Sequence, residues 1–376
     1  MELKNKKLAL FFTVGVSLKS WNISGNLKRE IKPYIFLSNY FGRIYFFTYG
    51  TKEEYKFKNE LTGNIEILPR KTFLPVKIYQ FFIPLIYRKE LKEIDIYKTN
   101  QMAASIPAIL AKWIYKKKLI IRCGYEWLSF LKKKNLWLKE KIAYLIEKIA
   151  YKNANKIILT SKRDRDFVIN KFKICSKKIK LVPNYIDTEI FKPLLNIPKE
   201  KNRVIFVGRL EKQKNLFNLI EAIAPLKVKL IIIGSGSFKK KLENFARKKK
   251  ANVEFRGNIP NEKLPEELNK SEIFILPSFY EGCPKALLEA MSCGLACIGA
   301  KVEGIKEIIM HKKNGYLCGT NSELIRKAIL KVLNDENLKK KIGRNEKARC
   351  YFYIGRDYIG KCSDMDFSNH WYFFLS

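Results

Sequence analysis

Two glutamates, Glu281 and Glu289, lie in a segment that has the features of a loop followed by a helix. An apolar run over residues 273–276 predicts a buried strand before it. Pro284 suits the first position of a helix, and Gly294 is typical of the residue just past a helix end. A helix N-terminus favours a phosphate, and carboxylates beside it can accept hydrogen bonds from hydroxyls. The segment therefore suits a ligand with phosphates and hydroxyls, such as a nucleotide sugar, although a surface loop before an ordinary amphipathic helix has the same spacing.

Two cations, Arg209 and Lys214, flank a second turn of the same kind. It follows an apolar run over residues 204–207, which predicts a buried strand, and precedes a helix expected over residues 216–224. Two fixed cations at a strand-to-helix turn can neutralise a diphosphate leaving group. On these residues alone, routine surface charges in a lysine-rich protein are an equally valid interpretation.

Glycine-bearing loops follow two further predicted strands. Gly15 follows the first strand, residues 8–14, at the position where a doubly wound sheet meets its ligand. Gly234 follows a strand over residues 230–233 in a sequence that is not a full G-x-G-x-x-G, so a dinucleotide site is not indicated. We expect a turn there whose backbone lets a nucleotide approach.

The segment around the two glutamates resembles the E-x7-E segment of retaining glycosyltransferases of the GT-B fold, family 4. The matching residues are Glu281, Gly282, Pro284, Leu288, Glu289, Ala290, Met291 and Gly294. Residues 208–215 resemble the family's G-R-L-x-x-x-K-N segment, and residues 183–187 resemble its PNGVD signature. The loop of residues 15–25 is similar to that of a bacterial and archaeal branch of the family.

The resemblance implies a role for each charged residue. Arg209 and Lys214 would stabilise the departing phosphate, Glu281 would hold the donor sugar hydroxyls, and Glu289 would accept from the ribose hydroxyls. Gly282 and Cys283 would offer backbone N–H groups to the sugar, and backbone groups of residues 258–259 would meet the base. The predicted donor-binding residues other than the charged ones are Gly15, Gly208, Gly234, Asn258, Ile259, Gly282, Cys283 and Pro284.

Acceptor contacts are expected in the first half of the chain. Sites in open α/β sheets lie outside the carboxyl ends of the strands, although each such residue alone equally suits a solvent-facing loop. The residues chosen on this ground are Ser17, Trp21, Gln101, Arg122, Tyr125 and Glu126. Many family members carry a histidine near the acceptor, but His311 and His370 both come late in this chain. We therefore name no general base, and we expect His311 to cap a helix end or to face solvent.

Strands and helices alternate in both halves of the chain. This order predicts an α/β protein with two doubly wound parallel-sheet (Rossmann-like) domains facing across a cleft, the GT-B arrangement. We expect an acceptor-side domain over residues 1–195 and a nucleotide-sugar-binding domain over residues 202–345, with a short polar linker between them. Residues 346–376 lose helical periodicity, so whether they cross back onto the first domain is open. A short helix is expected to start over residues 304–309.

The net charge of +38 is extreme for 376 residues and suggests an anionic partner. The lysines are scattered and no recognition motif accompanies them, which argues against nucleic acid. The amphipathic helix predicted over residues 137–151 has a basic face that could lie on anionic lipid, although a solvated helix fits equally. We expect a cytoplasmic protein with peripheral contact at the inner membrane face.

The eight cysteines form no C-x-x-C pair and the chain has only two histidines, so no zinc site is predicted. We expect no metal and no cofactor, because the nucleotide sugar is a substrate. Two alternatives remain: a nucleotide-sugar epimerase on the same fold, and a basic protein that binds anionic lipid or nucleic acid.

Overall fold

The computed structural model describes residues 3–124, 128, 137–184 and 186–343. The chain divides into two compact units, the first up to Pro183 and the second from Asn184 onwards. We expected the first domain to continue to residue 195. In the structure Phe191 lies in the apolar core of the second unit, and its carbonyl accepts a hydrogen bond from Ser292 Oγ. The segment from Ile186 to Phe191 therefore packs with the second unit. Tyr125 and Glu126 lie outside the described residues.

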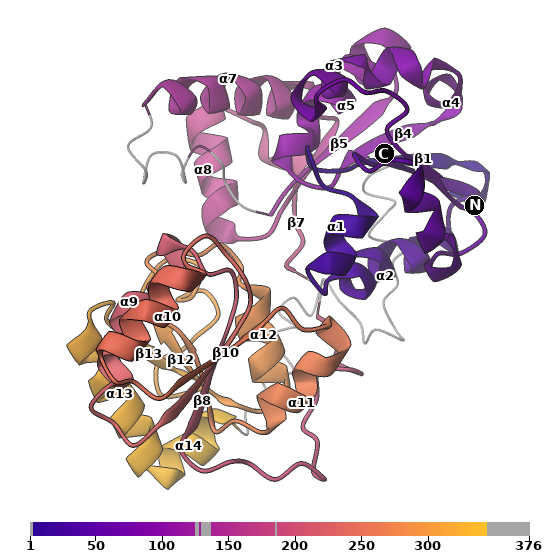
Figure 1. Cartoon of the computed structure of the whole chain (residues 1–376). Coiled ribbons are helices and arrows are strands. Elements are labelled where there is room, and N and C mark those ends of the chain that lie inside the picture. The colour runs from indigo at the N-terminus through magenta and orange to yellow at the C-terminus, as the bar shows by residue number, and fades with distance from the viewer. Residues whose placement is uncertain (1–2, 125–127, 129–136, 185, 344–376) are drawn as a thin grey trace. The chain divides into compact units, whose positions relative to one another are not determined.

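The first unit contains a seven-stranded parallel sheet (Figure 1). Its strands, in spatial order, are β3 (Ile65–Leu68), β2 (Arg43–Phe47), β1 (Lys7–Phe11), β4 (Ile96–Thr99), β5 (Lys118–Cys123), β6 (Lys156–Leu159) and β7 (Ile179–Leu181). Its helices are η1 (Leu3–Asn5), α1 (Leu18–Ile23), α2 (Leu27–Ser38), η2 (Lys52–Glu60), α3 (Val76–Ile86), α4 (Arg88–Glu93), η3 (Met102–Ala104), α5 (Ser105–Tyr115), α7 (Trp137–Asn153), α8 (Lys162–Phe172) and η4 (Ser176–Lys178).

The second unit contains a six-stranded parallel sheet. Its strands, in spatial order, are β10 (Val253–Gly257), β9 (Lys229–Ile233), β8 (Arg203–Val207), β11 (Ile273–Leu276), β12 (Ala296–Ala300) and β13 (Tyr316–Cys318). Its helices are η5 (Lys212–Lys214), α9 (Leu216–Ile223), α10 (Lys239–Lys248), η6 (Asn261–Lys263), α11 (Leu264–Asn269), α12 (Lys285–Ser292), α13 (Ser322–Asn334) and α14 (Glu336–Gly343). The prediction of two doubly wound parallel sheets is confirmed.

The strand order places the ligand-facing loops of each sheet. In the second unit the chain moves outward from β8 to β9 and β10, then returns to place β11 on the other side of β8. The order reverses between β8 and β11, so the chain leaves these two strands toward opposite faces of the sheet, at the edge where open α/β sheets bind their ligands. The same reversal occurs in the first unit between β1 and β4.

Continuous apolar runs build both cores. Strands of a parallel sheet that are covered on both faces read as unbroken apolar segments, and β11 is buried at all four of its residues. Four-residue β11 and β3 were predicted with the observed bounds, because a polar residue precedes each strand and a proline follows it.

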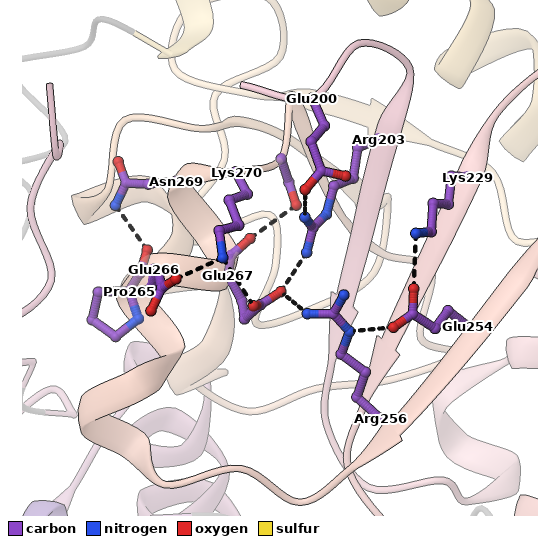
Figure 2. A network of polar contacts seen from close by, with 11 residues as sticks. Glu200, Arg203, Lys229, Glu254, Arg256, Pro265, Glu266, Glu267, Asn269 and Lys270 are labelled. Atoms are coloured by element: carbon purple, nitrogen blue, oxygen red, sulfur yellow. Dashed lines mark hydrogen bonds and ion pairs between the residues drawn. The ribbon is translucent and has the colours of Figure 1, made fainter. Parts of the chain in front are cut away.

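A charged network holds the second sheet on the side of α11 (Figure 2). Glu267 on α11 accepts from both Arg203 of β8 and Arg256 of β10, and Glu200 also pairs with Arg203. Arg203 is 1% exposed, and a buried cation needs such partners. The expected linker over residues 198–201 thus contributes Glu200 to the second unit's packing.

One predicted element is wrong. Residues 304–309 form turns and no helix. Gly304 has φ +80°, which is outside the helical region, and the side chains of Ile305 and Ile309 lie against Gly299 of β12. The segment follows the shape of the core below it, although its apolar spacing suggested a helix.

Candidate functional site

Lys214 and Glu281 meet at the carboxyl edge of the second sheet, in the loops that follow β8 and β11. Lys214 Nζ lies 2.5 Å from Glu281 Oε1, and the two side chains are 13% and 7% exposed. Ser278 Oγ donates to the same carboxylate oxygen over 2.6 Å. The sequence analysis assigned Lys214 and Glu281 to the same donor site on the basis of two separate motifs. In the structure the two side chains are in direct contact.

The loop after β8 is fastened to the loop after β11 by amide side chains. Gln213 Nε2 donates to the carbonyl of Tyr280 over 2.8 Å, and the amide N–H of Phe279 donates to the carbonyl of Gln213. Asn215 Nδ2 donates to the carbonyls of Pro277, over 3.0 Å, and of Thr320, over 2.7 Å. These bonds fix the backbone that carries Lys214 and Glu281, so the distance between the two charges depends on buried polar contacts.

Two glycines allow the loops to approach each other closely. Gly234, after β9, has φ +135°, and a Cβ there would lie 2.0 Å from the carbonyl oxygen of Gly208. Gly304 has φ +80°, and a Cβ there would lie 2.1 Å from the carbonyl oxygen of Gly282 and 2.5 Å from that of Glu281. Only glycine fits either position without moving the neighbouring backbone. Gly304 therefore supports the segment that contains the candidate catalytic carboxylate.

Arg209 is an exposed residue at the start of the loop after β8. Burial raises the pKa of Tyr280, and the positive charge of Arg209 opposes that shift. The structure thus keeps both predicted cations at the same edge as the carboxylate. Arg209 extends into solvent, whereas Lys214 is held by its ion pair.

Helix α12 begins beside this pair. Pro284 is its N-cap residue rather than its first helical residue, and Gly294 follows its end with φ +75°. Gly282 and Cys283 are half-buried in the turn that leads into the helix. The first amide groups of α12 therefore lie close in sequence to Glu281, as a phosphate site at a helix N-terminus requires.

Glu289 lies on the second turn of α12 and is 1% exposed. Its Oε1 accepts a bond of 3.4 Å from Asn261 Nδ2, at the start of η6. That contact joins α12 to the loop after β10, where Asn258 is exposed and Ile259 is half-buried. The residues predicted to meet the ribose and the base are thus connected through Asn261, which the sequence analysis did not identify.

The predicted acceptor residues of the first unit have several partners within the fold. Ser17 is the N-cap of α1 in a reciprocal pair with Ser20, and Trp21 stacks on Phe12 with ring centroids 4.5 Å apart. Gln101 Oε1 accepts from the amide of Gly124 over 2.9 Å. Ser17 and Trp21 are buried, so both contribute to packing.

Arg122 and Gly15 lie at the carboxyl edge of the first sheet. The Arg122 guanidinium donates to the carbonyl of Asn100 over 3.2 Å, which places it with Gln101 in the loop after β4. Gly15 is exposed and has φ +79° in the loop after β1. Gln101, Arg122 and Gly15 therefore remain the described first-unit candidates with access to a ligand.

The described part of the candidate donor site contains no group of metal-ligating side chains and no histidine. Among the residues that the structure describes, no three His, Cys, Asp or Glu side chains group closely enough to hold a metal ion. His311 is exposed, and its Nδ1 accepts from the amide of Leu317 over 3.0 Å. It does not cap a helix. Within the same described part of the chain, no helix is long and apolar enough to cross a bilayer.

The fold matches solved glycosyltransferase structures along almost the whole chain. Sucrose-phosphate synthase from Thermosynechococcus elongatus matches with a TM-score of 0.75 at 19% identity, covering 93% of this chain and 95% of that chain. HepE of Anabaena, solved with UDP and glucose, matches with a TM-score of 0.74 at 18% identity, covering 93% of this chain and 95% of that chain. These likenesses define the class of the fold as GT-B.

The chain belongs to the group 1, family 4 glycosyltransferases. Its residues 187–349 match the family described as glycosyl transferases group 1, and residues 42–190 match Glycosyltransferase Family 4. An uncharacterised glycosyltransferase of Methanocaldococcus jannaschii is 31% identical over 257 residues, which are 64% of this chain and 65% of that relative. A second relative, the UDP-Gal:alpha-D-GlcNAc-diphosphoundecaprenol alpha-1,3-galactosyltransferase of Escherichia coli, is 28% identical over 57% of this chain and 60% of its own length. The chain thus spans somewhat less than two thirds of these two relatives.

Proposed function

We propose that this protein transfers a sugar from a nucleotide-sugar donor to a glycan, lipid-linked or small-molecule acceptor with retention of anomeric configuration. The observation that carries the proposal is the contact between Lys214 and Glu281 at the reversal point of the second sheet. A cation and a carboxylate that share one edge suit a ligand in which a diphosphate is joined directly to a polyhydroxylated sugar. The family to which the chain belongs supports the same reaction class.

The chemical step needs stabilisation of the leaving diphosphate. As the bond between the anomeric carbon and the phosphate oxygen breaks, negative charge grows on that oxygen. In this scheme Lys214 and Arg209 neutralise it, together with the N-terminus of α12. In this scheme Glu281 accepts hydrogen bonds from the sugar hydroxyls and stabilises positive charge at the anomeric carbon. Ser278 holds the carboxylate in place through its bond to Oε1.

Retention is proposed to follow from attack on the face that the phosphate leaves. The acceptor oxygen forms its bond to the anomeric carbon as the carbon–oxygen bond to phosphate breaks. The acceptor's proton passes to the departing phosphate oxygen, so no side chain needs to act as general base. We propose that fixed cations replace a metal ion in this reaction, and that neither a metal nor a cofactor is needed.

The acceptor is proposed to bind through the first unit, with Gln101 and Arg122 among its contacts. The Escherichia coli relative is named for a diphosphoundecaprenol acceptor, which supports a lipid-linked substrate for this chain. A lipid-linked acceptor would place the protein in the cytoplasm, in peripheral contact with the anionic inner face of the membrane. The net charge of +38 agrees with such a location.

The test begins with a thermal-shift panel of UDP, GDP and ADP sugars. We expect one nucleotide series to raise the melting temperature, by ~3 °C or more if the ligand is present at ~100 times its dissociation constant. Lys214→Ala should abolish that shift, whereas Lys212→Ala, an exposed neighbour in the same loop, should not. If no nucleotide sugar moves the melting temperature at saturation, the donor site is assigned wrongly.

The selected donor then separates transfer from epimerisation. In the absence of acceptor, an epimerase converts the sugar of the nucleotide sugar into its epimer, whereas a transferase leaves it unchanged. NMR of the anomeric proton reports the result. With an acceptor panel that includes polyprenyl-diphosphate sugars, the anomeric coupling constant of the product shows retention or inversion.

A further inference from the structure

The outer face of α3 is apolar where a solvated helix carries polar residues. The side chains that face the sheet include Tyr79 and Ile83, which are buried. The opposite stripe, at i, i+3, i+4 and i+7, consists of the exposed residues Ile78, Phe81, Phe82 and Leu85. A helix that is apolar on both faces is stable when both faces contact apolar groups. The sheet and its core cover only the inner face of α3.

Helix α5 lies against α3, and its outer stripe is also apolar. Tyr115 at its end donates a hydrogen bond of 2.7 Å to the carbonyl of Pro84 in α3. Ile106 and Leu110 are half-buried on the outer stripe, and Trp113 and Ile114 are exposed at its end. The apolar stripe of α3 therefore continues onto α5.

Helix α7 extends the same face on the other side of α5. Trp113 Nε1 donates to Asn153 Oδ1 of α7 over 2.8 Å, which holds the two helices together. The residues at i, i+4 and i+7 of its outer side are the exposed Leu138, Ile142 and Leu145. Figure 1 shows α3, α5 and α7 together on one side of the seven-stranded sheet, with α1 and α2 on the other side. We call the outer face of α3, α5 and α7 the three-helix surface.

The charge of this surface has one sign over long stretches. No acidic residue occurs in residues 67–89, which contain α3, or in residues 96–125, which contain α5. Lysines border the apolar stripes at the ends of the helices, and α7 carries further exposed lysines. Those on and around α5 and α7 are Lys112, Lys116, Lys117, Lys118, Lys139, Lys141, Lys148 and Lys152, and α7 also carries the half-buried Glu140. Aromatic and aliphatic side chains surrounded by lysines match a bilayer that has anionic headgroups.

We propose that the three-helix surface docks onto an anionic lipid bilayer, with α3 lying in the headgroup region. The geometry also links this surface to the loop after β1, which is one of the candidate ligand-facing loops. Val76, the first residue of α3, has its Cγ1 3.9 Å from the position of a Cβ on Gly15. Docking through α3 would bring the loop after β1 to the lipid headgroups, where a lipid-linked acceptor presents its sugar. This assignment deepens the proposed function but can be tested without any donor or acceptor.

The test is co-sedimentation of the full-length protein with vesicles. We expect binding to vesicles of 70% phosphatidylcholine and 30% phosphatidylglycerol, weak binding to phosphatidylcholine alone, and weaker binding at 0.5 M than at 0.1 M salt. Ile78→Glu together with Phe82→Glu should lower the partition coefficient at least ~10-fold, because two apolar anchors become charged. The matched control, Ile23→Glu with Leu324→Glu, adds the same charge at exposed helix positions outside the surface and should leave binding within ~2-fold of the parent.

Three outcomes would overturn the proposal. Equal loss of binding in both double variants would show that net charge alone drives association. A parent that is dimeric by light scattering, and becomes monomeric in the Ile78/Phe82 variant without a change in vesicle binding, would make the surface an interface between copies. A large fall in melting temperature with unchanged vesicle binding would show that the surface packs against the protein's own residues. Failure of the donor panel would leave vesicle binding unaffected, so the two proposals fail independently.

Discussion

Replacing Glu281 with Gln should strengthen the binding of the nucleoside diphosphate while it abolishes transfer. In the structure Lys214 is paired with Glu281 at 2.5 Å. A diphosphate that binds to Lys214 must do so against the field of that carboxylate. Removing the negative charge leaves the lysine available to the phosphate, so the sign of the effect on diphosphate affinity is opposite to its effect on catalysis.

The magnitude follows from Coulomb's law. If the carboxylate and the phosphate lie ~8 Å apart on either side of one lysine, their repulsion is ~2 kcal/mol at an effective dielectric constant of ~20. Screening reduces this to ~1 kcal/mol, which corresponds to ~5-fold in the dissociation constant. Transfer should fall at least ~100-fold, because the charge that stabilises the anomeric carbon is lost.

Isothermal titration calorimetry with the nucleoside diphosphate, beside a transfer assay, measures both effects. Glu211→Gln is the matched control. Glu211 lies in the loop after β8, as Lys214 does, but its carboxylate accepts hydrogen bonds from Ser237. The substitution removes the same charge without releasing Lys214. Weaker diphosphate binding in Glu281→Gln, in a variant whose melting temperature shows that it is folded, would refute the electrostatic reasoning. Equal strengthening by both substitutions would show a general field effect and no specific role for the ion pair.

Three further substitutions test features of the fold. Gly304→Ala should lower activity more than stability, measured as transfer rate against melting temperature, because its Cβ would displace the carbonyls of Glu281 and Gly282. Glu267→Gln should lower the free energy of unfolding in urea by ~3 kcal/mol because it removes one of the two carboxylates that pair with the buried Arg203, whereas Glu266→Gln, at an exposed pair, should change it by ~0.5 kcal/mol or less. Burial, with a smaller contribution from a nearby arginine, lowers the pKa of Lys98 from 10.5 to about 7, so between these values the unfolded chain binds more protons and the parent gains stability as pH rises. Lys98→Met removes this dependence, so it should raise the free energy of unfolding by ~4 kcal/mol more at pH 6 than at pH 10.

The sequence predicted the sheets well for a physical reason. Buried parallel strands need unbroken apolar runs, and Ile273–Leu276 is such a run with the observed bounds. The edge strand Ile65–Leu68 also has the observed bounds, although Glu66 within it is exposed. The charged residues of the candidate site follow two of these strands directly, so their common edge was also predictable. What could not be predicted is which side chains hold the loops together. Asn215 donates to Thr320, 105 positions away, and no local pattern encodes such a contact.

The sequence analysis did not predict helix α3, because its outer face is apolar. Gln80 and Pro84 interrupt its apolar run, and its outer stripe lacks the polar residues by which an amphipathic surface helix is usually identified. A single polar stripe on the outer face would have identified the helix from sequence. The lack of that stripe is the observation on which the proposed bilayer contact rests.

The candidate donor site owes its geometry to backbone carbonyls more than to its charged residues. Gln213 and Asn215 act by donating to the carbonyls of Tyr280 and Pro277, and Gly304 acts by leaving room for those of Glu281 and Gly282. Such contacts do not depend on the side chains that the loop presents to a ligand. Ligand-facing residues of the loop after β11 can therefore be substituted without a change in the position of Glu281. On this argument the identity of the transferred sugar should be set by half-buried residues such as Cys283, and the reaction class by the fixed ion pair.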